Sequence, residues 1–285
     1  MKLEITHLTR YHYATPTSES VNEIRLTPSS NHRQSCYQHT VTVEPSVSLF
    51  SYDDFFGNRV HSFSVGDPHH ELMIKTTSIV VTDELEPERK QILSLKEQLE
   101  MLHSERFINQ HAEYLMDSKY TYIDPELAKP FVNGEIEVSI EKKLKMISEA
   151  IFTNYEYNPY ATHVKTTIAE IVHLQQGVCQ DFAHLMIAIC KNMQVPARYV
   201  SGYHFVGDLQ GGHADYEQAS HAWVEAFVPG IGWVGYDPTN NGDINWRYVK
   251  LCHGRDYEDI VPVKGIYRGT DQQRLEVIVN VKQVE

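Results

Sequence analysis

One segment, residues 176–196, carries the clearest structural signal: Gln176-Gly177-Val178-Cys179-Gln180-Asp181-Phe182-Ala183-His184-Leu185-Met186-Ile187-Ala188-Ile189-Cys190-Lys191-Asn192-Met193-Gln194-Val195-Pro196. Its apolar side chains fall at i, i+3, i+4, i+7, i+8 and i+11, and they are Phe182, Leu185, Met186, Ile189, Cys190 and Met193. This spacing is typical of a helix with one apolar face, which we expect to end near Pro196. The pattern puts Cys190 on the buried stripe and Cys179 at the amino-terminal end of the helix.

Cys179 is therefore placed as a nucleophile would be. The first turn of a helix leaves backbone N–H groups unsatisfied and carries the positive end of the helix dipole, and both favour a thiolate. Gly177 allows the tight turn into the helix, whereas the carboxylate of Asp181 opposes a negative charge on a nearby thiol. A cysteine that begins a helix is more often a small buried hydrophobe, so a nucleophile here requires a cationic partner elsewhere.

A candidate partner lies in the segment Ser220-His221-Ala222-Trp223-Val224-Glu225-Ala226-Phe227, which alternates like a strand. Alternation turns the small apolar residues to the core and leaves His221 on the opposite face among aromatic side chains. A partly desolvated imidazole at that position can pair with a thiolate. The alternative is a histidine that only hydrogen-bonds on the sheet, as one of the 16 in the chain.

The position of Asp237 depends on the register of a predicted hairpin. The turn Pro229-Gly230-Ile231-Gly232 reverses the chain into Trp233-Val234-Gly235-Tyr236-Asp237. If Phe227 pairs with Trp233, Asp237 lies opposite Trp223, on the face of His221 and within side-chain reach. A register one residue tighter turns Asp237 away, and it is then only a turn former. The first register completes a set of nucleophile, base and orienting carboxylate.

The whole sequence predicts an α+β fold in two domains, residues 1–85 and 86–285. Short alternating segments with polar turns indicate a small N-terminal β-sandwich. From about residue 86 the apolar spacing becomes helical, and a series of strands follows the Cys179 helix. After the boundary we expect helices over residues 92–102, 107–116, 139–155 and 171–174, and strands over 197–206, 219–228, 233–237 and 275–281.

Further motifs extend beyond this core. They are Gly177-Val178-Cys179-Gln180-Asp181-Phe182-Ala183-His184, Pro196-Ala197-Arg198-Tyr199-Val200-Ser201-Gly202-Tyr203, Ser220-His221-Ala222-Trp223-Val224, Gly232-Trp233, Asp237-Pro238-Thr239-Asn240, Arg25-Leu26-Thr27-Pro28, Asp54-Phe55-Phe56-Gly57-Asn58, Pro68-His69-His70-Glu71-Leu72, Gly254-Arg255-Asp256-Tyr257 and Pro262-Val263-Lys264-Gly265. Together they resemble the bacterial transglutaminase-like cysteine peptidase family over nearly the whole chain, most weakly over residues 86–135.

The resemblance implies a papain-like, transglutaminase-like core, a helical part plus an antiparallel sheet, with an N-terminal β-sandwich domain. It also implies that Cys179 is the nucleophile, His221 the general base and acid, and Asp237 the orienter. Animal transglutaminases use a tryptophan upstream of the nucleophile, but this chain has no tryptophan before Trp223. The backbone N–H of Cys179 is therefore the one oxyanion donor that we expect.

We expect no cofactor and no metal. The acidic residues at 256–259 are not part of an EF-hand loop. His69 and His70 are adjacent in a predicted strand, so their side chains point to opposite faces and are poorly placed to share a metal ion.

Composition narrows the class of partner. The chain has 285 residues, with 25 Lys and Arg against 38 Asp and Glu, and a formal charge of −13. It lacks the basic cluster that nucleic acids require, and no apolar run approaches the ~20 residues of a membrane span. The N-terminus has no apolar core of signal-peptide length, and the cysteine spacing matches neither a disulfide scaffold nor zinc knuckles. We expect a cytoplasmic protein with free thiols and with no nucleic-acid or membrane partner.

These observations predict a cysteine-nucleophile acyl-transfer enzyme that cleaves an amide or peptide bond through a thioester, as a cysteine protease or amidase does. The expected substrate is a peptide, a protein or another amide. Two alternatives stay open: transfer of the acyl group to an amine, as in a transglutaminase, and a catalytically silent binding module. The glycine-rich segment 207–218 between two strands is expected to be a mobile flap that controls specificity.

Overall fold

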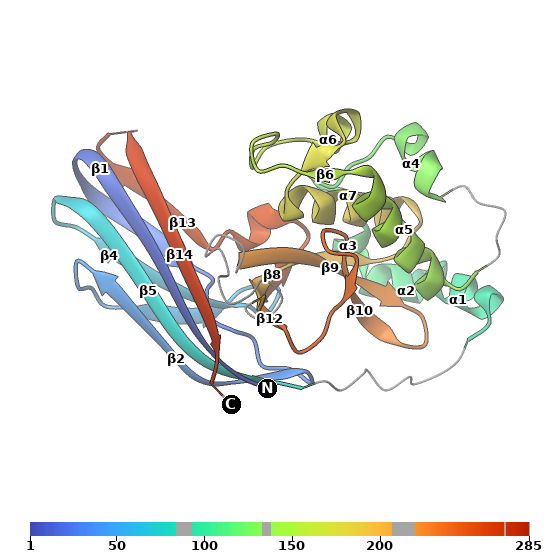
Figure 1. Cartoon of the computed structure of the whole chain (residues 1–285), viewed down its shortest axis with the longest axis horizontal. Helices are drawn as coiled ribbons and strands as arrows, with labels where there is room; N and C mark the ends of the chain where they lie inside the picture. Colours follow the sequence, from blue (N-terminus) through green and yellow to red (C-terminus); the bar gives the residue numbers. More distant parts are fainter. Residues whose placement is uncertain (84–92, 133–137, 207–219, 271, 285) are drawn as a thin grey trace.

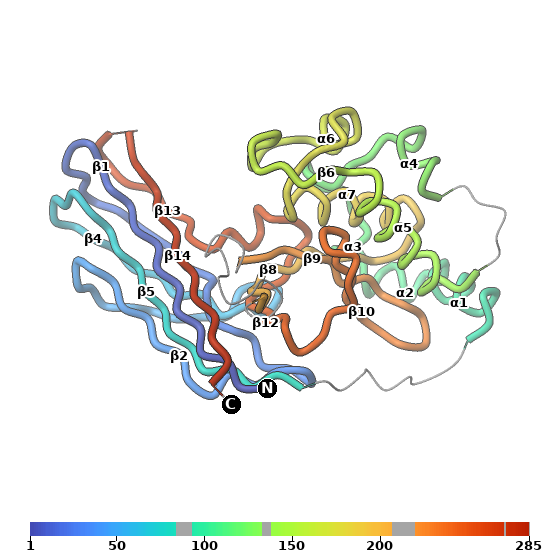
Figure 2. The backbone as a smooth tube through the Cα atoms, in the orientation of Figure 1, coloured from blue at the N-terminus to red at the C-terminus, as the bar shows by residue number. Residues whose placement is uncertain are grey.

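The structure is a computed structural model that describes residues 1–83, 93–132, 138–206, 220–270 and 272–284. Two regions lie side by side (Figure 1). One is a sandwich of long strands, and the other is a core in which helices cover a separate sheet. Both chain ends lie at the same end of the sandwich (Figure 2), where Leu3 pairs with Gln283. The predicted α+β architecture with an N-terminal β-sandwich is confirmed.

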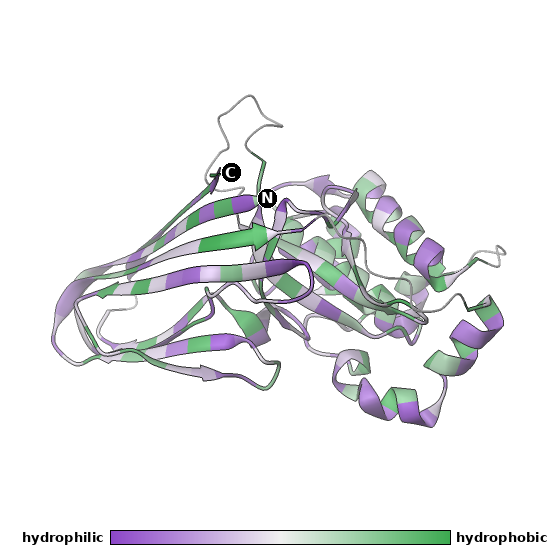
Figure 3. Ribbon diagram, turned by 90° about the horizontal axis from the view of Figure 1, so that it is seen from below, coloured by the Kyte–Doolittle hydropathy of each residue, from purple (hydrophilic) through white to green (hydrophobic). Residues whose placement is uncertain are grey.

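Alternating strands build the sandwich. Its longest strand, β1 (Lys2–Ile24), is shared by two sheets: the first half pairs with β5 (His69–Thr82) and the second half with β4 (Arg59–Val65). The outer strands are β2 (Gln34–Glu44) beside β5 and β3 (Phe50–Asp53) beside β4. Hydrophobic and hydrophilic residues alternate along these strands (Figure 3), so each strand turns one row of side chains inward. Phe63 from β4 and Leu72 and Ile74 from β5 meet in the resulting core.

The last two strands, β13 (Val263–Arg268) and β14 (Gln273–Gln283), also belong to the sandwich, because both pair with β1. The predicted division assigned residues 86–285 to the core, and residues 263–283 depart from it. Alternation along a sequence predicts a strand but does not identify its partner, and here the partner lies at the other end of the chain. The predicted boundary near residue 85 falls in 84–92, outside the described residues.

The core contains a five-stranded antiparallel sheet in the order β11, β10, β9, β8, β12 among the described residues. The bounds are β8 (Ala197–His204), β9 (Ser220–Val228), β10 (Gly232–Asp237), β11 (Gly242–Asp243) and β12 (Tyr248–Gly254). The helices are α1 (Leu95–Leu102), α2 (Glu105–Gln110), α3 (Ala112–Leu115), α4 (Pro125–Val132), α5 (Ile140–Asn154), α6 (Ile168–Leu174) and α7 (Cys179–Asn192). A short parallel pair, β6 (Glu156–Tyr157) and β7 (Gln176–Gly177), precedes α7. No helix in the described ranges is long and apolar enough to cross a membrane.

Helix α7 is buried on all sides, so the prediction of a single apolar face is wrong. The helix contacts β8 and β9 on one side and helices α4, α5 and α6 on others, and residues 181–191 are all buried. Small and apolar residues outside the predicted stripe, such as Ala183 and Ile187, make this possible. Lys191 is buried as well, and its Nζ donates to the carbonyl oxygen of Met116 (2.8 Å) and to Oγ1 of Thr121 (2.7 Å).

Two carboxamide side chains join the sandwich to the core sheet at its edge strand β12. Gln34 donates to the carbonyl oxygen of Lys250 (2.9 Å) and accepts from the N–H of the same residue (2.8 Å). Asn58 donates to the carbonyl oxygen of His253 (2.8 Å) and accepts from its N–H (2.9 Å). Each carboxamide takes the place of a residue in a neighbouring strand, so these backbone groups of β12 are satisfied.

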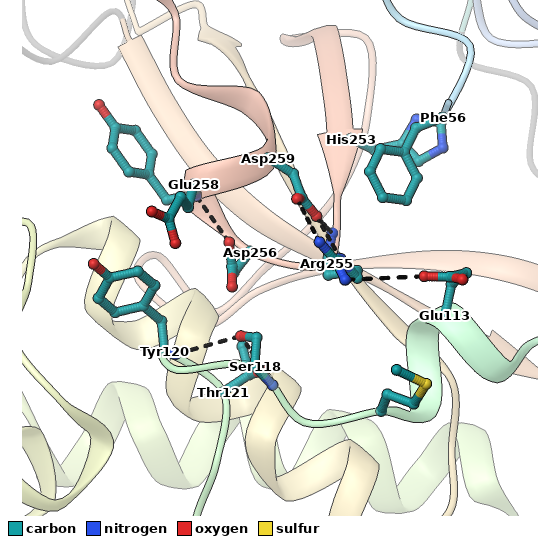
Figure 4. Close-up of polar contacts among 12 residues, drawn as sticks. Phe56, Glu113, Ser118, Tyr120, Thr121, His253, Arg255, Asp256, Glu258 and Asp259 are labelled. Carbon is teal, nitrogen blue, oxygen red and sulfur yellow. Dashed lines mark hydrogen bonds and ion pairs between the residues drawn. The ribbon is translucent and has the colours of Figure 1, made fainter. Parts of the chain in front are cut away.

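A short connector returns the chain from β12 to the sandwich (Figure 4). In it, Arg255 binds Asp259 through two nitrogen atoms (2.8 and 2.9 Å) and lies 4.0 Å from Glu113. The side chain of Asp256 accepts from the N–H of Glu258 (2.8 Å) and so caps the 3-10 turn η2 (Tyr257–Ile260). These contacts fix the direction in which the chain leaves the core for β13.

Candidate active site

Cys179 is the first residue of α7, as predicted. Asp181 stabilises the turn that precedes the helix. The buried Asp181 carboxylate accepts from the N–H of Val178 (2.9 Å) and from the hydroxyl of Thr162 (2.6 Å). A Cβ at Gly177 would lie only 2.8 Å from that carboxylate, so the turn requires glycine. Burial raises the pKa of Asp181, which weakens its opposition to a nearby thiolate.

The hairpin of β9 and β10 has the register that places Asp237 beside His221. Trp233 pairs with Phe227, and continuation of this register brings Asp237 opposite Trp223. The small apolar residues of β9 belong to the same core as α7. His221 lies on the other face of the strand, where its ring centroid is 6.3 Å from that of Trp223. The predicted register and the predicted faces of this strand are confirmed.

His221 lies between Cys179 and Asp237. Its Nε2 donates to Oδ2 of Asp237 at 2.8 Å, and the side chain of Cys179 hydrogen-bonds the same imidazole. Because Nε2 is engaged by the carboxylate, Nδ1 is the nitrogen that faces the sulfur. The side chain of His221 is 7% exposed and that of Asp237 is 0% exposed, so the pair is shielded from water. The structure thus brings the three predicted site residues together.

Asp237 has further hydrogen-bond donors that the sequence analysis missed. Its Oδ2 also accepts from the hydroxyl of Tyr248 (2.7 Å) and from Nδ2 of Asn240 (2.7 Å). Its Oδ1 accepts from the backbone N–H groups of Thr239 (2.9 Å) and Asn240 (3.2 Å). An Asp followed closely by Thr and Asn is a local signal for such a turn. Tyr248 comes from β12, and no local pattern indicates its contact with Asp237.

The surroundings of His221 and Asp237 favour the charged form of both groups. Burial alone would lower the pKa of His221, but the Asp237 carboxylate and the Cys179 side chain outweigh it and raise the pKa to about 10. Burial alone would raise the pKa of Asp237, but His221, Asn240 and Tyr248 hold it well below its usual range. At neutral pH the pair is therefore imidazolium and carboxylate, and a cationic imidazole beside sulfur favours the thiolate.

The four cysteines, all within the described ranges, are free thiols in different surroundings. Burial raises the pKa of Cys190 and of Cys252 to about 12. Burial also raises the pKa of the half-buried Cys36. Cys179 differs from these three by its hydrogen bond to a histidine whose pKa is raised.

The two adjacent histidines considered as metal ligands in the sequence lie in different surroundings. His69 is buried and lies 3.3 Å from Oγ1 of Thr17, whereas His70 is exposed. Within the described ranges, no group of three or more His, Cys, Asp or Glu side chains is arranged to hold a metal ion. The segment 207–218, predicted to be a flap, lies outside the described residues.

Comparison with known proteins identifies the class. Residues 3–81 match the bacterial transglutaminase-like N-terminal region, and residues 125–238 match the transglutaminase-like superfamily. The chain is also 35% identical to the uncharacterized protein ML0607 of Mycobacterium leprae, over 99% of each chain. The chain belongs to the transglutaminase-like superfamily, and the resemblance found in the sequence is confirmed.

Two other proteins are informative relatives. A crystal structure from Cytophaga hutchinsonii, described as a "Putative Cysteine Protease", is similar with a TM-score of 0.80 and 23% identity, over 100% of this chain and 91% of that one. At this identity the likeness shows the fold. A protein-glutamine gamma-glutamyltransferase of Pseudomonas aeruginosa is 30% identical over 30% of this chain and 13% of that protein.

Proposed function

We propose that the protein is a cysteine-nucleophile acyl-transfer enzyme that cleaves an amide or peptide bond, with Cys179, His221 and Asp237 as its catalytic residues. The observation that carries the proposal is the contact of one buried imidazole with both the Cys179 side chain and the Asp237 carboxylate. A nucleophile, a proton carrier and a group that orients the carrier are what acyl transfer through a thioester requires.

The proposed reaction has two half-reactions. The Cys179 thiolate attacks the carbonyl carbon of the amide and forms a C–S bond, while the carbonyl π electrons move to oxygen. When the carbonyl re-forms, the C–N bond breaks and His221 gives its Nδ1 proton to the leaving amine. A water molecule then attacks the thioester and passes a proton to His221, and the C–S bond breaks to release a carboxylic acid and regenerate the thiolate.

The start of α7 supplies the expected stabilisation for the oxyanion. Cys179 is the first residue of the helix, where backbone N–H groups have no partner within the helix. We propose that the N–H of Cys179 donates to the oxygen of the tetrahedral intermediate. A donor placed at the developing charge contributes roughly 3–4 kcal/mol to transition-state stabilisation in cysteine- and serine-type sites.

A second candidate function is transfer of the acyl group to a primary amine instead of water. The first half-reaction is the same. The amine nitrogen then attacks the thioester and loses a proton to His221, and the C–S bond breaks to give a new amide and regenerate the Cys179 thiolate. The name of the Pseudomonas aeruginosa relative, a protein-glutamine gamma-glutamyltransferase, favours this alternative. A third possibility, a catalytically silent module, is opposed by the contacts that His221 makes on both sides.

Site-selective alkylation tests the proposed nucleophile. The protein is treated with a limiting amount of iodoacetamide near pH 7, and the modified cysteines are identified by peptide mapping. We expect Cys179 to react first, because burial raises the pKa of Cys36, Cys190 and Cys252. The substitution His221→Gln is expected to slow Cys179 alkylation by roughly tenfold or more, since one unit of pKa corresponds to a factor of ten.

Two results of this experiment would overturn the proposal. One is a Cys179 that reacts no faster than Cys36, and the other is a rate that His221→Gln leaves unchanged. Cys36→Ser serves as the control, because it removes the half-buried competing thiol without touching the site.

The fate of the acyl group separates hydrolysis from transfer. A library of glutamine-containing and other peptides is incubated with the enzyme in the presence and absence of a labelled primary amine, and the products are analysed by mass spectrometry. Shortened peptides or free acids without incorporated label support hydrolysis. Labelled amide products, lost in Cys179→Ala, establish amine transfer instead.

A further inference from the structure

The carboxylate of Asp237 accepts more hydrogen bonds than are needed to orient His221. Its Oδ2 accepts from Nε2 of His221 (2.8 Å), the hydroxyl of Tyr248 (2.7 Å) and Nδ2 of Asn240 (2.7 Å). Asn240 lies on the strand-ending turn directly after Asp237, whereas Tyr248 belongs to β12 at the far edge of the sheet. A distant residue that reaches the same oxygen atom calls for a functional explanation.

Tyr248 reaches Asp237 across the face of the sheet that also carries Trp223. Strands β8 and β9 separate β12 from β10, and on β8 the intervening residue is Gly202, which pairs with His221. A Cβ at Gly202 would lie 2.5 Å from the ring of Trp223. Glycine at this position therefore leaves room for the buried Trp223 ring, which packs against Tyr248.

The ring of Tyr248 is fixed on two sides. It stacks against His204, its partner in the β8–β12 register, with centroids 4.3 Å apart and planes at 14°. Trp223 meets it edge-on, with centroids 5.5 Å apart. A phenol held in this way keeps its hydroxyl directed at Oδ2, and the hydrogen bond does not depend on a mobile side chain.

A donor to a carboxylate draws electron density from it and makes it a weaker acceptor toward any other donor. Each donor that Tyr248 and Asn240 supply therefore competes with His221 for the same oxygen atom. This competition matters for acyl transfer, since His221 must release its proton to the leaving amine in every cycle. An imidazolium held too strongly by a buried carboxylate would be a poor general acid.

We propose that Tyr248, held by His204 and Trp223, is a positioning residue that weakens the hold of Asp237 on the His221 proton and so keeps the imidazolium acidic enough to protonate the leaving group. The proposal rests on the proposed function, because it assigns a purpose to proton release by His221. Tyr248 touches neither sulfur nor substrate in this scheme, and it acts through Asp237.

The groups that face His221 set the direction of the expected effect. They are Cys179 on α7, Asp237 on β10, His204 on β8 and Tyr248 on β12. His204 is neutral near pH 7, because burial lowers its pKa to about 4. Of these groups, Asp237 is the one whose strength as an acceptor Tyr248 controls directly, so loss of the hydroxyl should raise the pH at which His221 releases its proton.

Titration of His221 by NMR tests the proposal. The full-length protein is labelled with ¹³C at histidine Cε1, the His221 signal is assigned from its absence in His221→Gln, and its midpoint is followed between pH 6 and 11. Tyr248→Phe is expected to raise the midpoint by roughly 0.5–1 pH unit, the size of one typical intramolecular hydrogen bond. Asn240→Ala removes a donor to the same oxygen atom and is expected to shift the midpoint in the same direction.

The matched control is Tyr236→Phe. The Tyr236 hydroxyl is buried and has no hydrogen-bond partner among the residues that the structure describes, so its removal is expected to leave the midpoint unchanged. An unchanged or lowered midpoint in Tyr248→Phe overturns the inference, whatever Asn240→Ala shows. The proposed function fails separately, if Cys179→Ala leaves the His221 midpoint of the wild type unchanged and His221→Gln leaves the alkylation of Cys179 unchanged.

Discussion

Two carboxylates on one β-hairpin, the buried Asp237 and the largely buried Glu225, show what separates a candidate catalytic group from a structural one. Glu225 is on β9, four residues after His221, and Asp237 ends β10. Burial would raise the pKa of each, yet in both cases the partners hold it well below its usual range. The two groups are thus alike in the direction of their pKa shift, although the Asp237 side chain is 0% exposed and that of Glu225 is 17% exposed.

Their partners differ. Glu225 accepts from Nε of Arg198 (2.7 Å) and Nζ of Lys250 (2.6 Å), so two cations surround one carboxylate. The Arg198 guanidinium in turn lies 4.2 Å from the centre of the Trp233 ring. Asp237 instead accepts from His221, an imidazole that can give up its proton and that contacts a thiol. A shifted pKa therefore indicates a functional site only where a reactive group lies next to the shifted one.

The largest effect is expected from Glu225→Gln. This substitution leaves the largely buried Arg198 and Lys250 without their negative partner, which costs up to about 3–5 kcal/mol, the figure for a fully buried ion pair. Urea unfolding should show this loss, while the rate of Cys179 alkylation in the folded protein stays near that of the wild type. Glu276→Gln is the control, because its pair with Arg10 is about one-third exposed and should be worth less than about 1 kcal/mol. A stable Glu225→Gln protein with an unreactive Cys179 would reverse the roles assigned to the two carboxylates.

Asp237→Asn is expected to have a smaller effect on stability. Unlike Glu225→Gln, it is expected to slow the alkylation of Cys179. The amide keeps the shape of the carboxylate but removes the charge that stabilises the His221 imidazolium. The rate of Cys179 alkylation near pH 7 is expected to fall by roughly tenfold or more, as one unit of pKa implies. If Cys179 in Asp237→Asn is alkylated as fast as in the wild type, Asp237 does not differ from Glu225 in its effect on the thiol.

The pH dependence of stability should also distinguish the His221–Asp237 pair from Glu225. The pKa of His221 is raised to about 10 in the folded protein, so its contribution is complete below about pH 6.5 and is lost as pH rises toward 10. The pKa of Glu225 is lowered, so its contribution is present above about pH 4.5 and is lost in acid. The difference in unfolding free energy between wild type and His221→Gln should therefore shrink between pH 7 and 10, by less than about 1.4 kcal/mol per pH unit. A difference that grows over this range would contradict the assigned charge state.

Much of the candidate site could be predicted from local patterns. Apolar spacing from Phe182 onward places Cys179 at a helix start. Of the two hairpin registers that the sequence left open, the one that pairs Phe227 with Trp233 places Asp237 on the face of His221, and the structure has that register. Helix periodicity and hairpin register are local properties, which a single sequence records directly.

The features that sequence analysis missed depend on contacts between distant segments. Tyr248 reaches Asp237 across two strands, and β14 pairs with β1 at the other end of the chain. The burial of α7 on all sides depends on three helices whose packing the spacing within α7 does not reveal. Alternation and periodicity indicate which side chains are buried, but not which elements bury them.

The pairing of β1 with β13 and β14 also bears on the order of folding. When β1 leaves the ribosome, β4 and β5 follow it closely, but two of its neighbours are made only after the entire core. The sandwich therefore begins as a partial sheet, and β13 and β14 can join it only after the core has been made. Pairing between such remote segments is slow to form, because the loop that it closes is long. The core, inserted between β5 and β13, has to fold within a sandwich that is not yet closed.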